Sequence, residues 1–328
     1  MRNRSLIMLG VILVGIALIG QGIFLPVFAA EKKHVVFGGG TTGGAYFIIS
    51  VGLSSIFEKY NPDIICTAQV TSGSTENIKG FDTGKIQISL TAGKYCYQAW
   101  DGISANFEDK KRKNIRYVMT GCESLYWIIT KASSGIKSIS DFKGHKIGIQ
   151  IGPNNPDTWP AWQGYFGLNS EDYELVAYGV AELLNALEDG VVDAALGAGP
   201  LPNTACSQYL YSHPDSIFIP WSEEGVKSIH ERYPQYLFSS VIPGGTYMGF
   251  PDDVPTVASQ NWVVTTEDVD PDIIYRFTKT IFEHSDELKS IHPLAPQFNF
   301  ENSAKTLKNL FLPVHPGALK YYKEKGIL

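Results

Sequence analysis

The stretch His34-Val35-Val36-Phe37-Gly38-Gly39-Gly40-Thr41-Thr42-Gly43-Gly44-Ala45-Tyr46-Phe47 places a glycine-rich segment between a predicted strand and a predicted helix. Residues 34–37 form a short apolar run typical of a strand, and residues 45–60 carry apolar side chains at helical spacing. A glycine-rich turn at this point exposes backbone N–H groups at the positive end of the helix dipole, which favours an anion. Two functions use this geometry, nucleotide binding and the capture of a small anionic or zwitterionic solute.

Residues 1–30 predict a secretory signal peptide. They begin with two arginines, continue with an apolar run over residues 6–19, and end with small residues before a cleavage site after Ala29 or Ala30. An uncleaved membrane anchor is the alternative. With either outcome we expect the body of the chain to be extracytoplasmic, in the periplasm or at the outer face of the cell membrane.

Length and charge restrict the class of protein. About 300 of the 328 residues remain after a signal peptide, which favours two lobes over a single core. The net charge of −6, without a basic face, is a poor match for nucleic acid. The cysteines lack the spacing of metal ligands, so we expect no metal and no cofactor. The sequence does not decide whether the four cysteines form disulfides or are buried thiols. They are Cys66, Cys96, Cys122 and Cys206.

Strands and helices are predicted to alternate along the first part of the chain. Predicted strands at residues 63–70 and 86–91 are each followed by a predicted helix, the first with Ser74 as its N-cap. This alternation favours a parallel sheet. The same alternation of strands and helices is predicted a second time further along the chain. Residues 190–199 match residues 84–93 in having Gly first, Leu seventh, Ala ninth and Gly tenth. Duplication and convergence both explain this match.

The middle of the chain predicts two places where the backbone crosses between lobes. Residues 116–121 and 125–131 are predicted to form two strands, and residues 256–265 form a strong β run that returns to the first lobe. Crossings near Tyr126 and Asn261 would form a hinge. The sequence therefore predicts an α/β fold of two lobes joined by a two-segment hinge.

The expected lobe boundaries follow from these crossings: lobe I takes residues 32–126 and 262–328, and lobe II takes residues 127–261. In open α/β sheets, ligands bind beyond the carboxyl ends of the strands, and facing lobes bury a solute between them. Those ends are rich in glycines, small hydroxyls and amides, which bind through neutral donors. They lie at residues 38–44, 71–77, 91–94, 152–158 and 197–204.

Motifs for nucleotide binding and for catalysis are weak or missing. Gly38, Gly40 and Gly43 satisfy G-x-G-x-x-G, but the acidic residue expected after the second strand is replaced by Thr71 and Ser72. The chain has no P-loop, no G-x-S-x-G and no H-E-x-x-H, and we interpret His315 as a turn residue. We therefore expect a binding protein that is not an enzyme. A secreted enzyme on the same scaffold, or a ligand-sensing module for a membrane signalling partner, is the alternative.

Four stretches together carry a resemblance to a known family: residues 38–46 (GGGTTGGAY), 72–77 (SGSTEN), 135–144 (GIKSISDFKG) and 315–326 (HPGALKYYKEKG). The chain resembles the TAXI family, the extracytoplasmic solute-binding proteins of tripartite ATP-independent periplasmic (TRAP) transporters. The resemblance implies a periplasmic-binding-protein-like fold that closes around its ligand. It also implies delivery of a small solute, often an amino acid or dicarboxylate, to a membrane permease driven by an ion gradient.

The candidate ligand-binding residues come from the strand ends and from this resemblance. The chain departs from the family's pattern at Lys94, where an acidic residue is common, and in its second binding loop, where amides and Trp159 replace hydroxyls. These departures concern the identity of the solute more than the fold. The full candidate set is Thr42, Gly43, Gly44, Tyr46, Ser74, Asn77, Thr91, Gly93, Lys94, Asn154, Thr158, Trp159 and Pro202.

Overall fold

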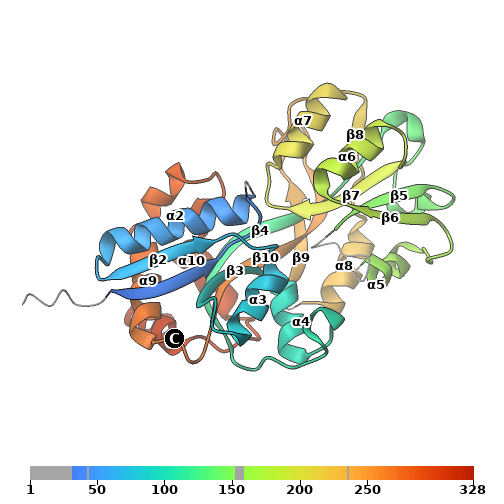
Figure 1. Cartoon of the computed structure of the whole chain (residues 1–328). Helices are drawn as coiled ribbons and strands as arrows, with labels where there is room; N and C mark the ends of the chain where they lie inside the picture. The colour runs from blue at the N-terminus through green and yellow to red at the C-terminus, as the bar shows by residue number, and fades with distance from the viewer. Residues whose placement is uncertain (1–31, 43, 152–158, 235) are drawn as a thin grey trace, which may run out of the picture. The chain divides into compact units, whose positions relative to one another are not determined.

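The glycine-rich stretch lies between β1 (Lys33–Gly38) and α2 (Ala45–Tyr60), as the sequence predicts (Figure 1). The bounds of α2 are those expected from its helical periodicity. The computed structural model describes residues 32–42, 44–151, 159–234 and 236–328. The predicted signal peptide and three candidate site residues, Gly43, Asn154 and Thr158, lie outside the described residues.

The first half of the sheet is built from the predicted strand–helix units. The order is β2 (Ile64–Gln69), β1 and β3 (Ile88–Ala92), with β1 and β3 parallel. Two helices follow their strands, α3 (Ser74–Asp82) and α4 (Gly93–Asp101). The carboxyl ends of β1, β2 and β3 therefore lead directly into the first turns of α2, α3 and α4.

Two long antiparallel strands occupy the middle of the sheet, β4 (Ile115–Lys131) and β10 (Val254–Thr266). The prediction of two separate strands at residues 116–121 and 125–131 was wrong. The polar segment between them suggested a turn, but Glu123 and Ser124 continue the ladder opposite Gln260 and Ser259. Pairing to β10 supplies the backbone hydrogen bonds that a turn would otherwise provide, so the strand continues through the polar residues.

The second half of the sheet repeats the parallel plan with β7 (Ala194–Gly199), β5 (Lys146–Gln150) and β6 (Glu174–Tyr178). The strand β7 pairs antiparallel with β4. Two short strands, β8 (Ser216–Phe218) and β9 (Leu237–Ile242), pair with β4 and β10, and β9 was missed in the tyrosine-, glycine- and proline-rich segment. The helices here are α5 (Trp159–Gln163), α6 (Val180–Glu188), α7 (Thr204–Ser212) and α8 (Glu223–Arg232).

Three helices end the chain: α9 (Pro271–Glu283), α10 (Phe300–Leu307) and α11 (Pro316–Glu324). The sequence Asp270-Pro271-Asp272 predicts a helix start with an N-cap, and Asp270 accepts a hydrogen bond from the backbone N–H of Asp272. The sequence also predicts that this helix runs to about residue 291, which is wrong, because α9 ends at Glu283 and a 3₁₀ segment follows. Among the described residues, no helix combines the length and the apolar character that crossing a membrane requires.

Buried apolar side chains form three clusters within the compact unit of residues 34–328. The first cluster takes its residues from 35–122 and 262–322, so the first strands share a core with the C-terminal helices. The other two clusters take theirs from residues 125–258. In Figure 1, β4 and β10 run from the group of elements that contains the first cluster to the group that contains the others. The fold is therefore a two-lobed α/β fold with two connecting strands.

The sequence match between residues 84–93 and 190–199 extends to hydrogen bonds. Gln87 accepts one from the backbone N–H of Val36 (2.8 Å), and Asp193, at the matching position, accepts one from Lys146 (2.8 Å). The threonine hydroxyls of neighbouring β10 and β4 donate to the carbonyls of Gln87 and Asp193, each at 2.6 Å. The same local geometry therefore occurs in each half of the sheet.

The side chain of Asn77 joins three strand ends inside the first half. Its Nδ2 donates to the carbonyls of Gly39 (2.8 Å) and Leu90 (3.0 Å), and its Oδ1 accepts from the hydroxyl of Thr71 (2.8 Å). The residue is fully buried. A Cβ on Gly38 would lie 2.6 Å from Asn77 Oδ1, so a glycine is required there by packing.

We expect Asn77→Ala to lower the free energy of unfolding by about 2–4 kcal/mol, because it leaves buried carbonyls without donors. Chemical denaturation followed by circular dichroism measures the loss. Asn185→Ala, on the exposed face of α6, is the matched control and should change stability by less than about 0.5 kcal/mol. Equal midpoints for the two variants would contradict the structural role of Asn77.

Candidate functional site

A cavity of about 400 Å³ lies where the carboxyl ends of the strands from both halves meet. The first half lines it through the segments that follow β1, β2 and β3 and through one residue of the loop after α4. These residues are Gly40, Thr41, Gly44, Ala45, Tyr46, Ser72, Gly73, Ser74, Thr75, Ala92, Lys94, Tyr95 and Asn106. The second half contributes Gln150, Ala198, Gly199, Pro200 and Asn203, and the central strands contribute Ser124, Tyr126 and Ser259.

Three helices of the first half begin at this cavity. The residues that precede α2, α3 and α4 are Gly44, Gly73 and Ala92, and none of these three supplies a side-chain cap. The first N–H groups of a helix have no partner within the helix, and they carry the positive end of its dipole. The first-half wall of the cavity is therefore rich in backbone donors.

Lys94, in the first turn of α4, adds a positive charge to this wall. Its side chain is 3% exposed and lies over the ring of Tyr95, with Nζ 5.0 Å from the ring centroid. Among the described lining residues, Lys94 has the only charged side chain. The electrostatic character of the described cavity wall is therefore positive.

Tyr46 connects the start of α2 to the central strands. Its hydroxyl donates to Oδ1 of Asn261, whose Nδ2 donates to the carbonyl of Cys122 (2.7 Å) and to Oγ of Ser124 (3.0 Å). Burial raises the pKa of the Tyr46 phenol well above its usual value, and the Cys122 thiol raises it further. The phenol therefore stays neutral and keeps its proton on the bond to Asn261.

Ser74 reaches the cavity in a different role from the one predicted. The N-cap of α3 is Gly73, with φ of 110°, a conformation that glycine adopts without steric cost. Ser74 is instead the first residue of the helix, and its Oγ accepts a hydrogen bond from the backbone N–H of Ala92 (3.1 Å). This bond joins the start of α3 to the end of β3.

The structure brings together four of the predicted site residues as cavity lining: Gly44, Tyr46, Ser74 and Lys94. Asn77 and Thr91 lie buried behind the wall, with their side chains bonded to strand carbonyls and to Ser89. Gly93 packs against the backbone, where a Cβ would lie 2.9 Å from the carbonyl oxygen of Gln260.

The other predicted residues lie away from the described lining. Trp159 is buried among aromatic rings and donates to the hydroxyl of Tyr173 (2.5 Å), while Thr42 and Pro202 are exposed. The predicted set omitted ten polar lining residues: Thr41, Ser72, Thr75, Tyr95, Asn106, Ser124, Tyr126, Gln150, Asn203 and Ser259. Two of these had a visible signal, because Ser124 and Ser259 interrupt otherwise apolar strands near the predicted crossings.

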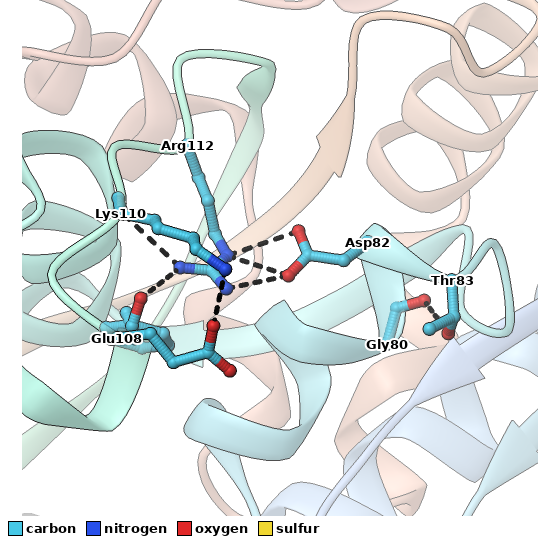
Figure 2. Close-up of polar contacts among 7 residues, drawn as sticks. Gly80, Asp82, Thr83, Glu108, Lys110 and Arg112 are labelled. Atoms are coloured by element: carbon cyan, nitrogen blue, oxygen red, sulfur yellow. Dashed lines mark hydrogen bonds and ion pairs between the residues drawn. The ribbon is translucent and has the colours of Figure 1, made fainter.

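Arg112 fixes the loop that carries Asn106 (Figure 2). Its guanidinium forms a two-pronged ion pair with Asp82 of α3, with Nη2 2.7 Å and Nε 2.9 Å from Oδ2. Its Nη1 also donates to the carbonyl of Phe107 (2.9 Å), whose ring packs under the guanidinium. Arg112 thus ties this loop to α3, and it also holds the carbonyl of Phe107, the residue after Asn106.

The chain matches the NMT1-like family over residues 37–326. It belongs to the NMT1-like family. The match covers both halves of the sheet and the C-terminal helices, so the family extends over the whole described fold. The narrower resemblance to TAXI proteins stays a prediction.

Solved structures similar to this NMT1-like chain include one from Bordetella bronchiseptica RB50, at 13% identity and a TM-score of 0.52, covering 90% of this chain and 98% of the other. The periplasmic aliphatic sulphonate binding protein SsuA from Escherichia coli is 15% identical, with a TM-score of 0.48, covering 89% and 78%. The substrate binding protein of an amino acid ABC transporter is 12% identical, with a TM-score of 0.43, covering 85% and 99%. The likeness to the Bordetella protein concerns the fold alone.

The four cysteines of this NMT1-like chain are free and buried. Burial raises the pKa of the Cys66 and Cys122 thiols to about 12, and it raises those of the other two as well. Of the two alternatives left by the sequence, the structure shows buried thiols. Within the described residues, no group of His, Cys, Asp or Glu side chains is arranged to hold a metal ion.

We expect the folded protein to react with a thiol reagent such as 5,5′-dithiobis(2-nitrobenzoate) at pH 8 at less than about one hundredth of the rate of free cysteine. A raised pKa keeps each thiol protonated, and burial excludes the reagent. After unfolding in guanidinium without reductant, all four thiols should react. Fewer than four would reveal a disulfide and contradict the structure.

Proposed function

We propose that this protein is an extracytoplasmic solute-binding receptor, which captures a small anionic or zwitterionic solute in the cavity and delivers it to a TRAP-type permease. The convergence of three helix N-termini and Lys94 on one cavity carries the proposal. Helix N-termini hold anions through backbone donors and dipole charge, and a buried lysine adds a full positive charge. The wall therefore provides what a carboxylate or sulfonate needs.

The size and composition of the cavity support a small solute that is bound rather than converted. A volume of about 400 Å³ lies in the range of small-molecule sites. Apart from Lys94, the polar side chains among its described lining residues are neutral hydroxyls and amides. Such groups hold a ligand by hydrogen bonds, whereas acid–base chemistry needs groups that gain and lose protons near neutral pH.

The central strands support closure around the solute. We place the hinge where the pairing of β4 and β10 shifts register, between Gln260 and Trp262 and between Val263 and Val264. The proposed lobe boundaries are those expected from the sequence, residues 32–126 with 262–328 and residues 127–261. The separate cores on either side of these strands support this division.

The transport partner and the location rest on the sequence. The resemblance to TAXI proteins supports a TRAP permease as partner, and the predicted signal peptide supports an extracytoplasmic location. Native mass spectrometry of the purified protein tests the receptor role, because it should reveal a co-purified solute that remains chemically unchanged on incubation. A solute that is converted during incubation would instead identify an enzyme.

We expect Lys94→Met to weaken binding of this solute by roughly ten- to a hundredfold, since a hydrogen bond to a charged group contributes about 1.5–3 kcal/mol. Methionine keeps an apolar stem of similar length and removes the charge. Isothermal titration calorimetry measures the change. Lys111→Met, in the exposed loop after α4, is the matched control and should bind within twofold of the parent. Parent-like affinity for Lys94→Met would place the anion elsewhere.

We expect Gly199→Leu to fill the cavity and weaken binding by at least about tenfold. A Cβ on Gly199 meets no atom within 4 Å, although the residue lines the cavity, so the fold should tolerate the substitution within about 1 kcal/mol. Gly164→Leu, at an equally open position away from the cavity, is the control. Calorimetry and thermal unfolding check both. Unchanged affinity for Gly199→Leu, with the fold intact, would show that the solute does not occupy this part of the cavity.

A further inference from the structure

The hydroxyl oxygen of Ser74, in the first-half wall, already accepts a hydrogen bond from the protein backbone. Its Oγ accepts from the backbone N–H of Ala92, and the residue is 9% exposed. A serine hydroxyl whose oxygen accepts from the backbone keeps its own proton to donate. Ser74 therefore presents a donor to the cavity, next to the backbone donors of the helix starts.

Both amides among the described residues of the second-half wall are oriented in the same way. Oε1 of Gln150 accepts from the backbone N–H of Ala198 (3.1 Å), and Oδ1 of Asn203 accepts from the N–H of Cys206 (3.1 Å) as the N-cap of α7. A backbone N–H pairs with the oxygen of an amide and not with its NH₂ group, so these bonds fix which end faces the protein. The NH₂ groups of Gln150 and Asn203 are left as the donors of this wall.

Tyr46, Ser124 and Asn261 satisfy one another between the two walls. The Tyr46 hydroxyl donates to Asn261, and Asn261 donates to Ser124. These two bonds occupy Oδ1 of Asn261 and one acceptor site of the Ser124 hydroxyl. The described walls thus combine donors on both sides with the positive charge of Lys94.

We propose that the solute is an anion with hydrogen-bond acceptors at both ends and no ammonium group, such as a dicarboxylate or a hydroxy- or oxo-substituted sulfonate, and that Gln150 and Asn203 determine this specificity. The inference rests on the proposed receptor function and narrows its ligand class, because it ranks such anions above free amino acids. Carboxylate and sulfonate oxygens accept from every donor described. An ammonium group that faced Ser74, Gln150 or Asn203 would bring only donors to side chains whose oxygens already accept from backbone N–H groups.

Matched pairs of probes test this class by calorimetry on the purified protein: succinate with L-aspartate, glutarate with L-glutamate, and isethionate with taurine. Within any pair that binds, we expect the member without the ammonium group to bind at least about tenfold more tightly. An amino acid that binds as tightly as its partner would overturn the inference and leave the receptor function intact. If no probe gives a heat of binding and no solute co-purifies, the result would instead contradict the proposed receptor function.

Asn203→Asp tests the specificity role directly. Aspartate is as good an N-cap as asparagine, so its one oxygen keeps the bond to Cys206 while the other replaces the NH₂ donor by a charged acceptor. We expect succinate to bind at least about tenfold more weakly and the succinate-to-aspartate preference to shift toward aspartate. Asn185→Asp, on the exposed face of α6, is the matched control and should leave the preference unchanged.

Gln150→Glu repeats the test from a different strand, with Gln208→Glu on the exposed face of α7 as its control. Thermal unfolding confirms that each variant is folded before its affinities are compared. A shift toward aspartate in either cavity variant, and in neither control, supports the assignment. An unchanged preference in both folded cavity variants would show that these amides do not determine the ligand specificity.

Discussion

The pairing of β4 with β10 is the constraint on which the other parts of this structure depend. Both strands contribute to all three apolar clusters, and each half of the parallel sheet joins one of the two strands, β3 joining β10 and β7 joining β4. Their register shift brings the side chain of Asn261 to the carbonyl of Cys122, to which it donates a hydrogen bond. The same side chain accepts a hydrogen bond from the hydroxyl of Tyr46. The start of α2 is thus attached to the middle of the sheet, which gives any movement of the halves a direct connection to the cavity wall.

Local patterns predicted the elements well because most of them are amphipathic or apolar over their whole length. The lengths of α2 and α6 follow from the periodicity of their apolar residues, and their first residues follow from the glycine that precedes each helix. The continuity of β4 was not predictable, because its polar centre is stabilised by a partner strand more than a hundred residues away in sequence. A pattern within one segment carries no information about a neighbour that arrives from so distant a part of the chain.

The candidate site was predictable as a place and less so as a set of side chains. Strand ends rich in glycine indicated segments that line the cavity, yet Gly38 is required by the packing of Asn77, and Gly39 by the Ser50 hydroxyl, which occupies the space that a Cβ would need. Asn77 looked like a ligand because it is a polar residue near a helix start, but its amide holds three strand ends together. Whether a polar residue faces a solute or the backbone depends on its tertiary partners, which the sequence does not show.

The aromatic cluster beside the cavity gives the protein an internal optical probe. Tyr126 lines the cavity, and its ring packs edge-on against Trp162 and Trp221, at centroid distances of 5.1 and 6.0 Å. The indole N–H of Trp221 has no hydrogen-bond partner among the described residues, so its emission depends on the rings around it. A solute that displaces Tyr126 therefore changes the surroundings of two fluorophores in this core. Intrinsic fluorescence reports occupancy without any added dye.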